Sequence, residues 1–237
     1  MNRKLACRVL FLFVPGFVAS AISAAEEVVI PRGDAGWKYL DQTAEPGENW
    51  SAASFDDAEW SEGQALLGYG DDDVRTKLSY GNNVVNKRRV AFFRKLFRIR
   101  NRARFKRYVG RVCCDDGAVV YVNRCEVFRR NMPAGRVTSS TLAVRAVGPD
   151  SRNERQYVTF LVEDNVVRDG HNVVAVSVHQ ATPTSSDLAL DLELVGLETE
   201  EEVRKVEESV KQSQPDGQSG AVNSLPGPIV RFSTSAQ

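Results

Sequence analysis

Segments of alternating apolar and polar residues constrain the fold of this chain more than any other feature. One runs from Cys114 to Asn123, a second from Asn172 to Gln180, and a third from Ser185 to Leu194. In each, apolar side chains recur at every second position, which is the pattern of a strand buried on one face. Asp-Gly, Asn and Pro turns separate the segments, and no helical periodicity lies between them. The pattern predicts an antiparallel β-sandwich.

Other stretches extend this prediction. Strands are expected at residues 37–40, 90–100, 107–114, 118–122, 125–128 and 157–162. In the last strand Leu188 and every second residue to Leu194 face inward, while Asp191 and Glu193 face outward. Asn123-Arg124 predicts a two-residue hairpin loop, where Asn suits a positive φ and Arg is a poorer choice than Gly.

The first 25 residues predict a signal peptide. Arg3, Lys4 and Arg8 form a basic region before an apolar stretch at 9–18, and small residues at 23–25 suit cleavage. The apolar run is short for a membrane span, so we expect none after cleavage; an uncleaved N-terminal anchor is the alternative. We therefore expect export, to the periplasm, the cell surface or the extracellular space.

The rest of the chain divides into three parts. Residues 26–197 are expected to form the sandwich. Residues 198–213 predict a short amphipathic helix or linker, because Thr199 to Glu202 matches a capping box and Val203, Val206 and Val210 form a narrow apolar stripe. Residues 214–237 are rich in Gln, Ser, Gly and Pro, which is typical of a flexible tail.

Charge is balanced overall, with 31 basic and 31 acidic residues, but it is unevenly placed. From Lys87 to Arg111 there are twelve Lys or Arg and no acid. Such a stretch could bind an acidic polymer, or it could be a solvated strand that protects a sheet edge from aggregation. Export makes intracellular nucleic acid an unsuitable partner. The residues assigned to this polyanion surface are Arg94, Arg98, Arg100, Arg102, Arg104, Lys106 and Arg107.

Several short motifs, taken in order, resemble those of a known family. They are Trp37 to Asp41, Leu67 to Asp71, Ser79 to Gly81, Phe93-Arg94, Asp115 to Asn123, Asn131 to Pro133, and Val178 to Leu188. Between about Gly33 and Leu197 the chain is similar to galactose-binding-like jelly-roll modules, which accompany catalytic domains in large exported bacterial proteins. The resemblance implies a jelly-roll sandwich with a binding or accessory role. The chain departs from it at Arg124, where a turn glycine is expected, and in the basic stretch.

Motifs for catalysis are missing from the sequence. There are two His, and no HExxH pair, nucleophile elbow or phosphate-binding glycine loop occurs. Asp115 and Asp116 could serve glycoside hydrolysis, but adjacent Asp residues before Gly are more typical of a tight turn. We therefore expect a non-enzymatic module that requires no cofactor, with a glycoside hydrolase as the least favoured reading.

The expected ligand is carbohydrate or cell-envelope polysaccharide. Sugars are held by an aromatic ring and a few fixed polar groups at a concave surface. The candidate residues, at loops and strand ends, are Tyr69, Tyr80, Arg94, Asn131, His179 and Gln180. For His179 the alternative is a hydrogen bond that holds a loop. For the whole chain the alternative is a structural, protein-interaction module.

Two further sets of residues leave alternatives open. Asp71, Asp72 and Asp73 could bind a structural calcium ion, or they could simply solubilise a loop. Cys113, Cys114 and Cys125 could form one disulfide, or act as small buried apolar residues.

Overall fold

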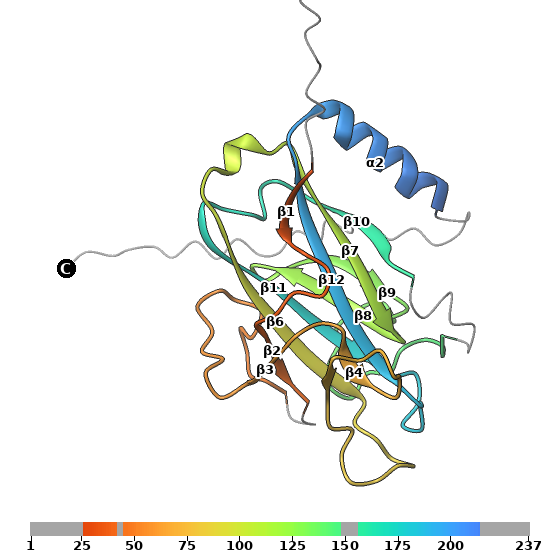
Figure 1. The fold of residues 1–237 in the computed structure, drawn as a ribbon. Helices are drawn as coiled ribbons and strands as arrows, with labels where there is room; N and C mark the ends of the chain where they lie inside the picture. Colours follow the sequence, from red (N-terminus) through yellow and green to blue (C-terminus); the bar gives the residue numbers. More distant parts are fainter. Residues whose placement is uncertain (1–25, 42–44, 148–155, 214–237) are drawn as a thin grey trace, which may run out of the picture.

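The structure is a computed structural model, and it describes residues 26–41, 45–147 and 156–213. Two six-stranded sheets pack face to face, and a helix lies at the C-terminal end of the described chain (Figure 1). The predicted antiparallel β-sandwich with a short C-terminal helix is confirmed. The predicted signal peptide and tail lie outside the described residues.

The first sheet is built around a long central strand. Its main strand order is β10 (Val158–Val162), β7 (Arg107–Asp115), β12 (Leu188–Leu197), β4 (Leu67–Tyr69) and β5 (Thr76–Lys77). β1 (Glu27–Ile30) also pairs with β12. The pairs are antiparallel except for the short parallel pair β4–β5.

The second sheet is antiparallel throughout. Its order is β3 (Ser61–Gly63), β2 (Trp37–Leu40), β6 (Val90–Ile99), β11 (Gly170–His179), β8 (Gly117–Val122) and β9 (Cys125–Arg130). β6 and β11 are therefore central strands, with neighbours on both sides.

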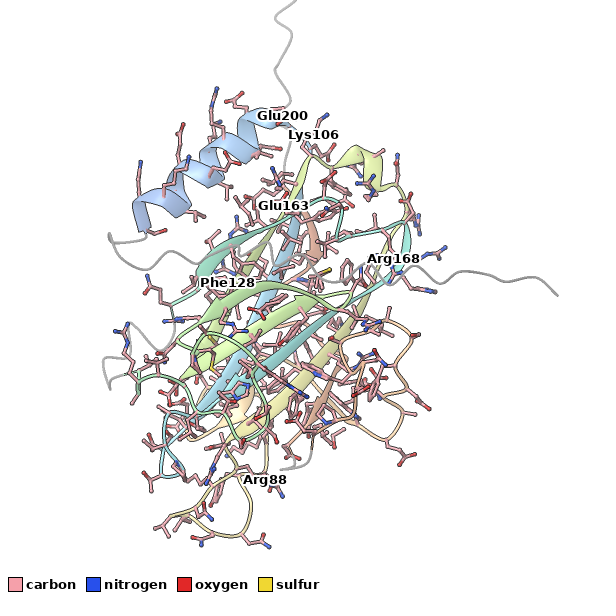
Figure 2. All side chains as sticks on the ribbon, turned by 180° about the vertical axis from the view of Figure 1, so that it is seen from behind. Arg88, Lys106, Phe128, Glu163, Arg168 and Glu200 are labelled. Atoms are coloured by element: carbon pink, nitrogen blue, oxygen red, sulfur yellow. The ribbon has the colours of Figure 1, made fainter. Side chains whose placement is uncertain are left out.

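The core lies between the sheets, where the alternating side chains predicted to face inward meet. Val174, Val176 and Val178 of β11 share one buried cluster with the inward leucines of β12. The chain crosses between the sheets several times, and two of these crossings are between β7 and β8 and between β11 and β12. The loops at these two crossings lie at one end of the sandwich, which we call the loop end; Arg88 marks it in Figure 2, opposite Lys106 and Glu200.

Local sequence signals explain the hairpin and the helix. β8 and β9 are joined by Asn123 and Arg124, whose φ angles of 48° and 75° fit a type I′ turn. α2 (Glu200–Ser213) starts at the predicted capping box, where Thr199 N–H donates to Glu202 at 3.1 Å and Glu202 N–H donates to Thr199 at 3.2 Å. Val203 packs with Val195 and Leu197.

The helix does not resemble a membrane span. Among the residues that the structure describes, no helix combines the length and the apolar character needed to cross a bilayer.

Candidate functional site

Five of the six predicted ligand residues gather at the loop end. Tyr69 ends β4, His179 ends β11, and Gln180 follows it. The Gln180 amide donates to the Tyr69 hydroxyl at 2.7 Å, and the rings of Tyr69 and Tyr80 meet edge to face with centroids 5.3 Å apart. Tyr69 therefore contacts both Gln180 and Tyr80.

Most of these side chains hold loops rather than face solvent. Gln180 is fully buried and also donates to the Asp187 carbonyl at 2.6 Å. Burial raises the pKa of Tyr69 to about 12. Lys87 lies over both tyrosine rings, 5.5 and 5.3 Å from their centroids, and donates to the Ser185 carbonyl. These contacts occupy groups that a sugar would need.

His179 and Asn131 are used in the same way. The Nδ1 atom of His179 lies 2.9 Å from the Thr141 carbonyl, and the side chain is fully buried. Because a carbonyl only accepts, Nδ1 carries the proton. Burial lowers the pKa of His179 to about 4. The Asn131 amide donates to the carbonyls of Asp116 and Arg145 at 3.1 and 2.7 Å.

Asp116 connects its own loop to two others through hydrogen bonds. Its carboxylate accepts hydrogen bonds from Val147 N–H at 2.7 Å, Ala181 N–H at 2.8 Å and the Ser185 hydroxyl at 3.3 Å. Asp115 and Asp116 are both buried. The sequence predicted local turn bonds for these two residues, whereas Asp116 binds groups 31 to 69 positions away.

Arg94 lies away from this end and inside the protein. Its guanidinium donates to Asp57 at 2.7 Å and to the carbonyls of Trp50, Ala52 and Phe55. The side chain is fully buried beneath the loop that carries these partners. Arg94 was predicted to belong to both the ligand set and the polyanion surface. Both predictions are wrong for this residue, because its side chain faces protein and not solvent.

The remaining basic residues do not form one continuous positive surface. Arg102 pairs with Asp164 at 3.1 Å, Arg104 with Glu27 and Glu198, and Arg107 with Glu163. Arg98, Arg100 and Lys106 are exposed and form no ion pair with an acid in the described ranges. Three of the six remaining residues are therefore neutralised by neighbouring carboxylates.

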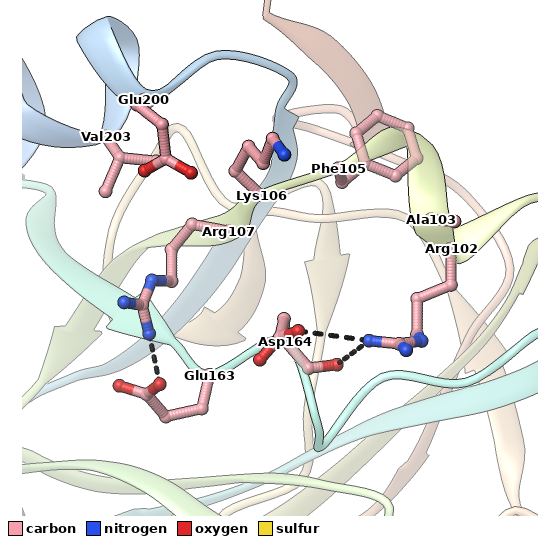
Figure 3. A pocket seen from close by; sticks show the side chains of 9 residues that line it. All are labelled: Arg102, Ala103, Phe105, Lys106, Arg107, Glu163, Asp164, Glu200 and Val203. Atoms are coloured by element: carbon pink, nitrogen blue, oxygen red, sulfur yellow. Dashed lines mark hydrogen bonds and ion pairs between the residues drawn. The ribbon is translucent and has the colours of Figure 1, made fainter.

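Three of these basic residues line a cavity of about 400 Å³ at the end of the sandwich opposite the loop end (Figure 3). Figure 3 shows Arg107 directed at Glu163 and Arg102 at Asp164, with Lys106 and Glu200 on the opposite wall. Phe105 also lines it but is only 7% exposed. The cavity therefore offers charged groups in pairs and little aromatic surface to a sugar ring.

A second cavity, of about 430 Å³, lies on the outer face of the first sheet, where Cys113 of β7 and Asp191 of β12 line it. We call it the Tyr157 cavity. The Tyr157 hydroxyl donates to Asp191 at 2.7 Å, and the Arg32 guanidinium lies 4.1 Å from the centre of the Tyr157 ring. Burial, together with the bond to Asp191, raises the pKa of Tyr157. The ring is thus fixed in the cavity wall.

Charged groups complete the Tyr157 cavity. Arg75 lines it, is exposed, and pairs with no acid in the part of the chain that the structure describes. Asp73, one of the predicted calcium ligands, also lines it. Sequence reasoning did not select Tyr157, Arg32 or Arg75. The available signal was Asp191, one of two acids directed outward from a strand of mostly apolar residues.

Calcium binding stays a prediction. Asp72 and Asp73 are exposed and Asp71 is half-buried. Within residues 26–41, 45–147 and 156–213, no three His, Cys, Asp or Glu side chains are grouped so as to hold a metal ion.

Comparison with known proteins gives a limited result. No family model matches the chain, and no curated protein matches it. Among solved structures, a beta-glucuronidase from Bacteroides uniformis is 14% identical, with a TM-score of 0.46, over 73% of this chain and 18% of that one. A beta-glucuronidase from an uncultured Clostridium species is 12% identical, with a TM-score of 0.45, over 73% and 30%. A beta-glycosidase from Bacteroides vulgatus is 14% identical, with a TM-score of 0.41, over 71% and 20%. The chain thus spans less than a third of each of these proteins, and similarity at this level assigns no activity.

Proposed function

We propose that this chain is an exported, non-catalytic β-sandwich module that binds carbohydrate in the Tyr157 cavity. The observation that supports the proposal is the fixed Tyr157 ring beside Arg32 and Arg75 in a cavity of about 430 Å³. Ligand sites of this size combine an apolar surface with a few placed polar groups. The Tyr157 cavity has this composition, whereas the loop end uses its tyrosines for packing.

Each group has a distinct role in the proposed complex. Arg32 covers one face of the Tyr157 ring and pairs with Glu193 at 3.3 Å. In the proposed complex the rest of the ring packs against the apolar face of a pyranose, and the exposed Arg75 guanidinium donates to hydroxyl or carboxylate oxygens. Asp191 fixes the ring, because its carboxylate accepts from the Tyr157 hydroxyl and from the Gly33 N–H. A preformed wall of this kind limits the entropy lost on binding.

The hydrogen bonds of Asp191 favour binding over hydrolysis. Glycosidases generally need two carboxyl groups, one of which donates a proton to the leaving group. Asp191 is 5% exposed and accepts from Gly33, Tyr157 and Leu192. These bonds commit both oxygens of the Asp191 carboxylate to Gly33, Tyr157 and Leu192 of its own chain. Its role in the proposal is to position the ring.

A glycan array tests the proposal, run with and without Ca²⁺ and at two salt concentrations. We expect binding that is weakened about tenfold or more in Tyr157→Ala and in Arg75→Ala, since each removes a direct contact. Tyr80→Ala is the matched aromatic control at the loop end and should bind as the parent does. Circular dichroism confirms that each variant is folded.

Three outcomes contradict the proposal. Loss of binding in Tyr80→Ala but not in Tyr157→Ala would move the site to the loop end. Hydrolysis of a bound glycan would show an enzyme. An array without any binding would leave a protein-interaction module as the better account.

A further inference from the structure

Exposed cations gather on the outer face of the second sheet, at the end opposite the loops. Arg98 of β6 lies directly across from His171 of β11, and both are exposed. Leu96, two residues before Arg98, is 51% exposed. Arg100 directly follows β6, and Arg168 lies two residues before β11. Figure 2 shows Arg168 projecting away from the body of the protein. We call Arg98, Arg100, Arg168 and His171 the β6–β11 basic patch.

This patch differs from the rest of the basic stretch in how its charges are compensated. Arg102, Arg104 and Arg107 each pair with a carboxylate. Arg98, Arg100 and Arg168 have no such partner among the described residues. Asp169, the acid next in sequence, accepts the Arg102 N–H at 2.6 Å. Within the described ranges, three unpaired arginines therefore lie near one neighbouring acid, and the patch is positive overall.

Stability and edge protection do not account for this arrangement. A guanidinium directly opposite an imidazole in a sheet gains no ion pair that would stabilise the strand pairing. Charges also protect exposed sheet edges from aggregation, but β6 and β11 are central strands. The arrangement is what a site for an anion requires.

We propose that the β6–β11 basic patch binds an acidic polysaccharide, with sulfate or carboxylate groups spaced along its chain. Arg98 and Arg100 are two positions apart, which corresponds to roughly 7 Å along an extended chain. A polymer with repeated charges can contact both, and Arg168, two residues before β11, offers a third cation at the same end of the β6–β11 pair. Stacking on aromatic side chains is the usual means of holding single-stranded nucleic acid. Of the large apolar side chains exposed within the described residues, the one in this patch is Leu96, and none is aromatic.

The proposal is independent of the Tyr157 cavity. That cavity lies on the outer face of the first sheet, whereas the basic patch lies on the outer face of the second. The failure of one site would therefore leave the other in place, and separate substitutions distinguish them.

Titration calorimetry with dextran sulfate tests the patch, at about 50 and 200 mM salt. With about three charge contacts, affinity should fall tenfold or more between these salt concentrations, because binding releases counterions. Arg98→Glu combined with Arg168→Glu should abolish binding. Arg98→Gln combined with Arg168→Gln should reduce it about tenfold, and serves if the charge reversal disturbs folding.

The control changes net charge equally at another place. Arg204→Glu combined with Lys211→Glu alters two exposed residues of α2 and should leave binding within about twofold. The proposal is overturned if this control loses as much affinity as the patch variant, or if binding does not respond to salt. Binding of an oligonucleotide without binding of dextran sulfate would also overturn it.

Discussion

His179 is held as a neutral imidazole by its surroundings. It is fully buried, its Nδ1 faces the Thr141 carbonyl, and its Nε2 has no hydrogen-bond partner among the described residues. Burial lowers its pKa from 6.5 to about 4. Between about pH 6.5 and pH 4, the unfolded chain binds a proton at this residue that the folded chain does not. His179 therefore favours folding above pH 6.5, and this contribution is lost as the pH falls toward 4.

The loss amounts to roughly 3 kcal/mol for a shift of this size. Urea unfolding between pH 7 and pH 4.5 measures it. In His179→Asn the amide nitrogen takes the place of Nδ1 and does not titrate, so the decline in unfolding free energy should become clearly shallower. The parent protein, measured under the same conditions, gives the full decline. Equal slopes in the parent and in His179→Asn would show that other groups produce it.

At the scale of elements, the β8–β9 hairpin carries a turn residue that costs stability. Arg124 has a φ of 75°, which side chains other than glycine rarely adopt. Its N–H donates to the Ser51 carbonyl, a bond that glycine would keep. We expect Arg124→Gly to raise the free energy of unfolding by about 0.5 to 1 kcal/mol. Arg98→Gly, in the extended strand β6, should lower the free energy of unfolding. An increase for Arg98→Gly, or a decrease for Arg124→Gly, would contradict this account.

Elements that depend on neighbours in sequence were predicted well. The Asn123-Arg124 turn, the capping box before α2 and the alternation in β11 and β12 are local patterns, and the structure contains each of them. Arg94, by contrast, reads locally as an outward residue of a strand. Arg94 is buried because a loop about 40 positions earlier in the chain packs over it and accepts its hydrogen bonds.

The candidate site was predicted less well for the same reason. The Tyr157 cavity is assembled from residues near positions 32, 65, 75, 113, 157 and 191. The alternation of apolar and polar residues in the last strand shows that Asp191 faces outward, but it does not show which residues contact its carboxylate. Similarly, the basic stretch is visible in the sequence, whereas its compensation by Glu27, Glu163 and Glu198 is visible only in the fold.

At the scale of the whole molecule, the two sheets share one buried cluster, and this predicts a single cooperative unfolding unit. Cys114 lies in that cluster, paired with Leu190 in the first sheet, while Cys125 is exposed at the start of the edge strand β9. Burial raises the pKa of the Cys114 thiol to about 11. Because the thiolate is the reactive form, Cys114 should react with iodoacetamide only when the sandwich opens.

Peptide mapping after timed exposure to iodoacetamide tests this. We expect Cys125 to be modified in the native protein and Cys114 to be protected by several orders of magnitude, because its labelling requires global unfolding. With increasing urea, Cys114 labelling should rise at the same midpoint as the loss of the circular dichroism signal, while Cys125 is insensitive to urea. Labelling of Cys114 well below that midpoint would show that the sheets separate locally. A disulfide-linked peptide joining Cys114 to Cys125 would instead show that the two sheets are covalently connected, in contrast to the thiols in this structure.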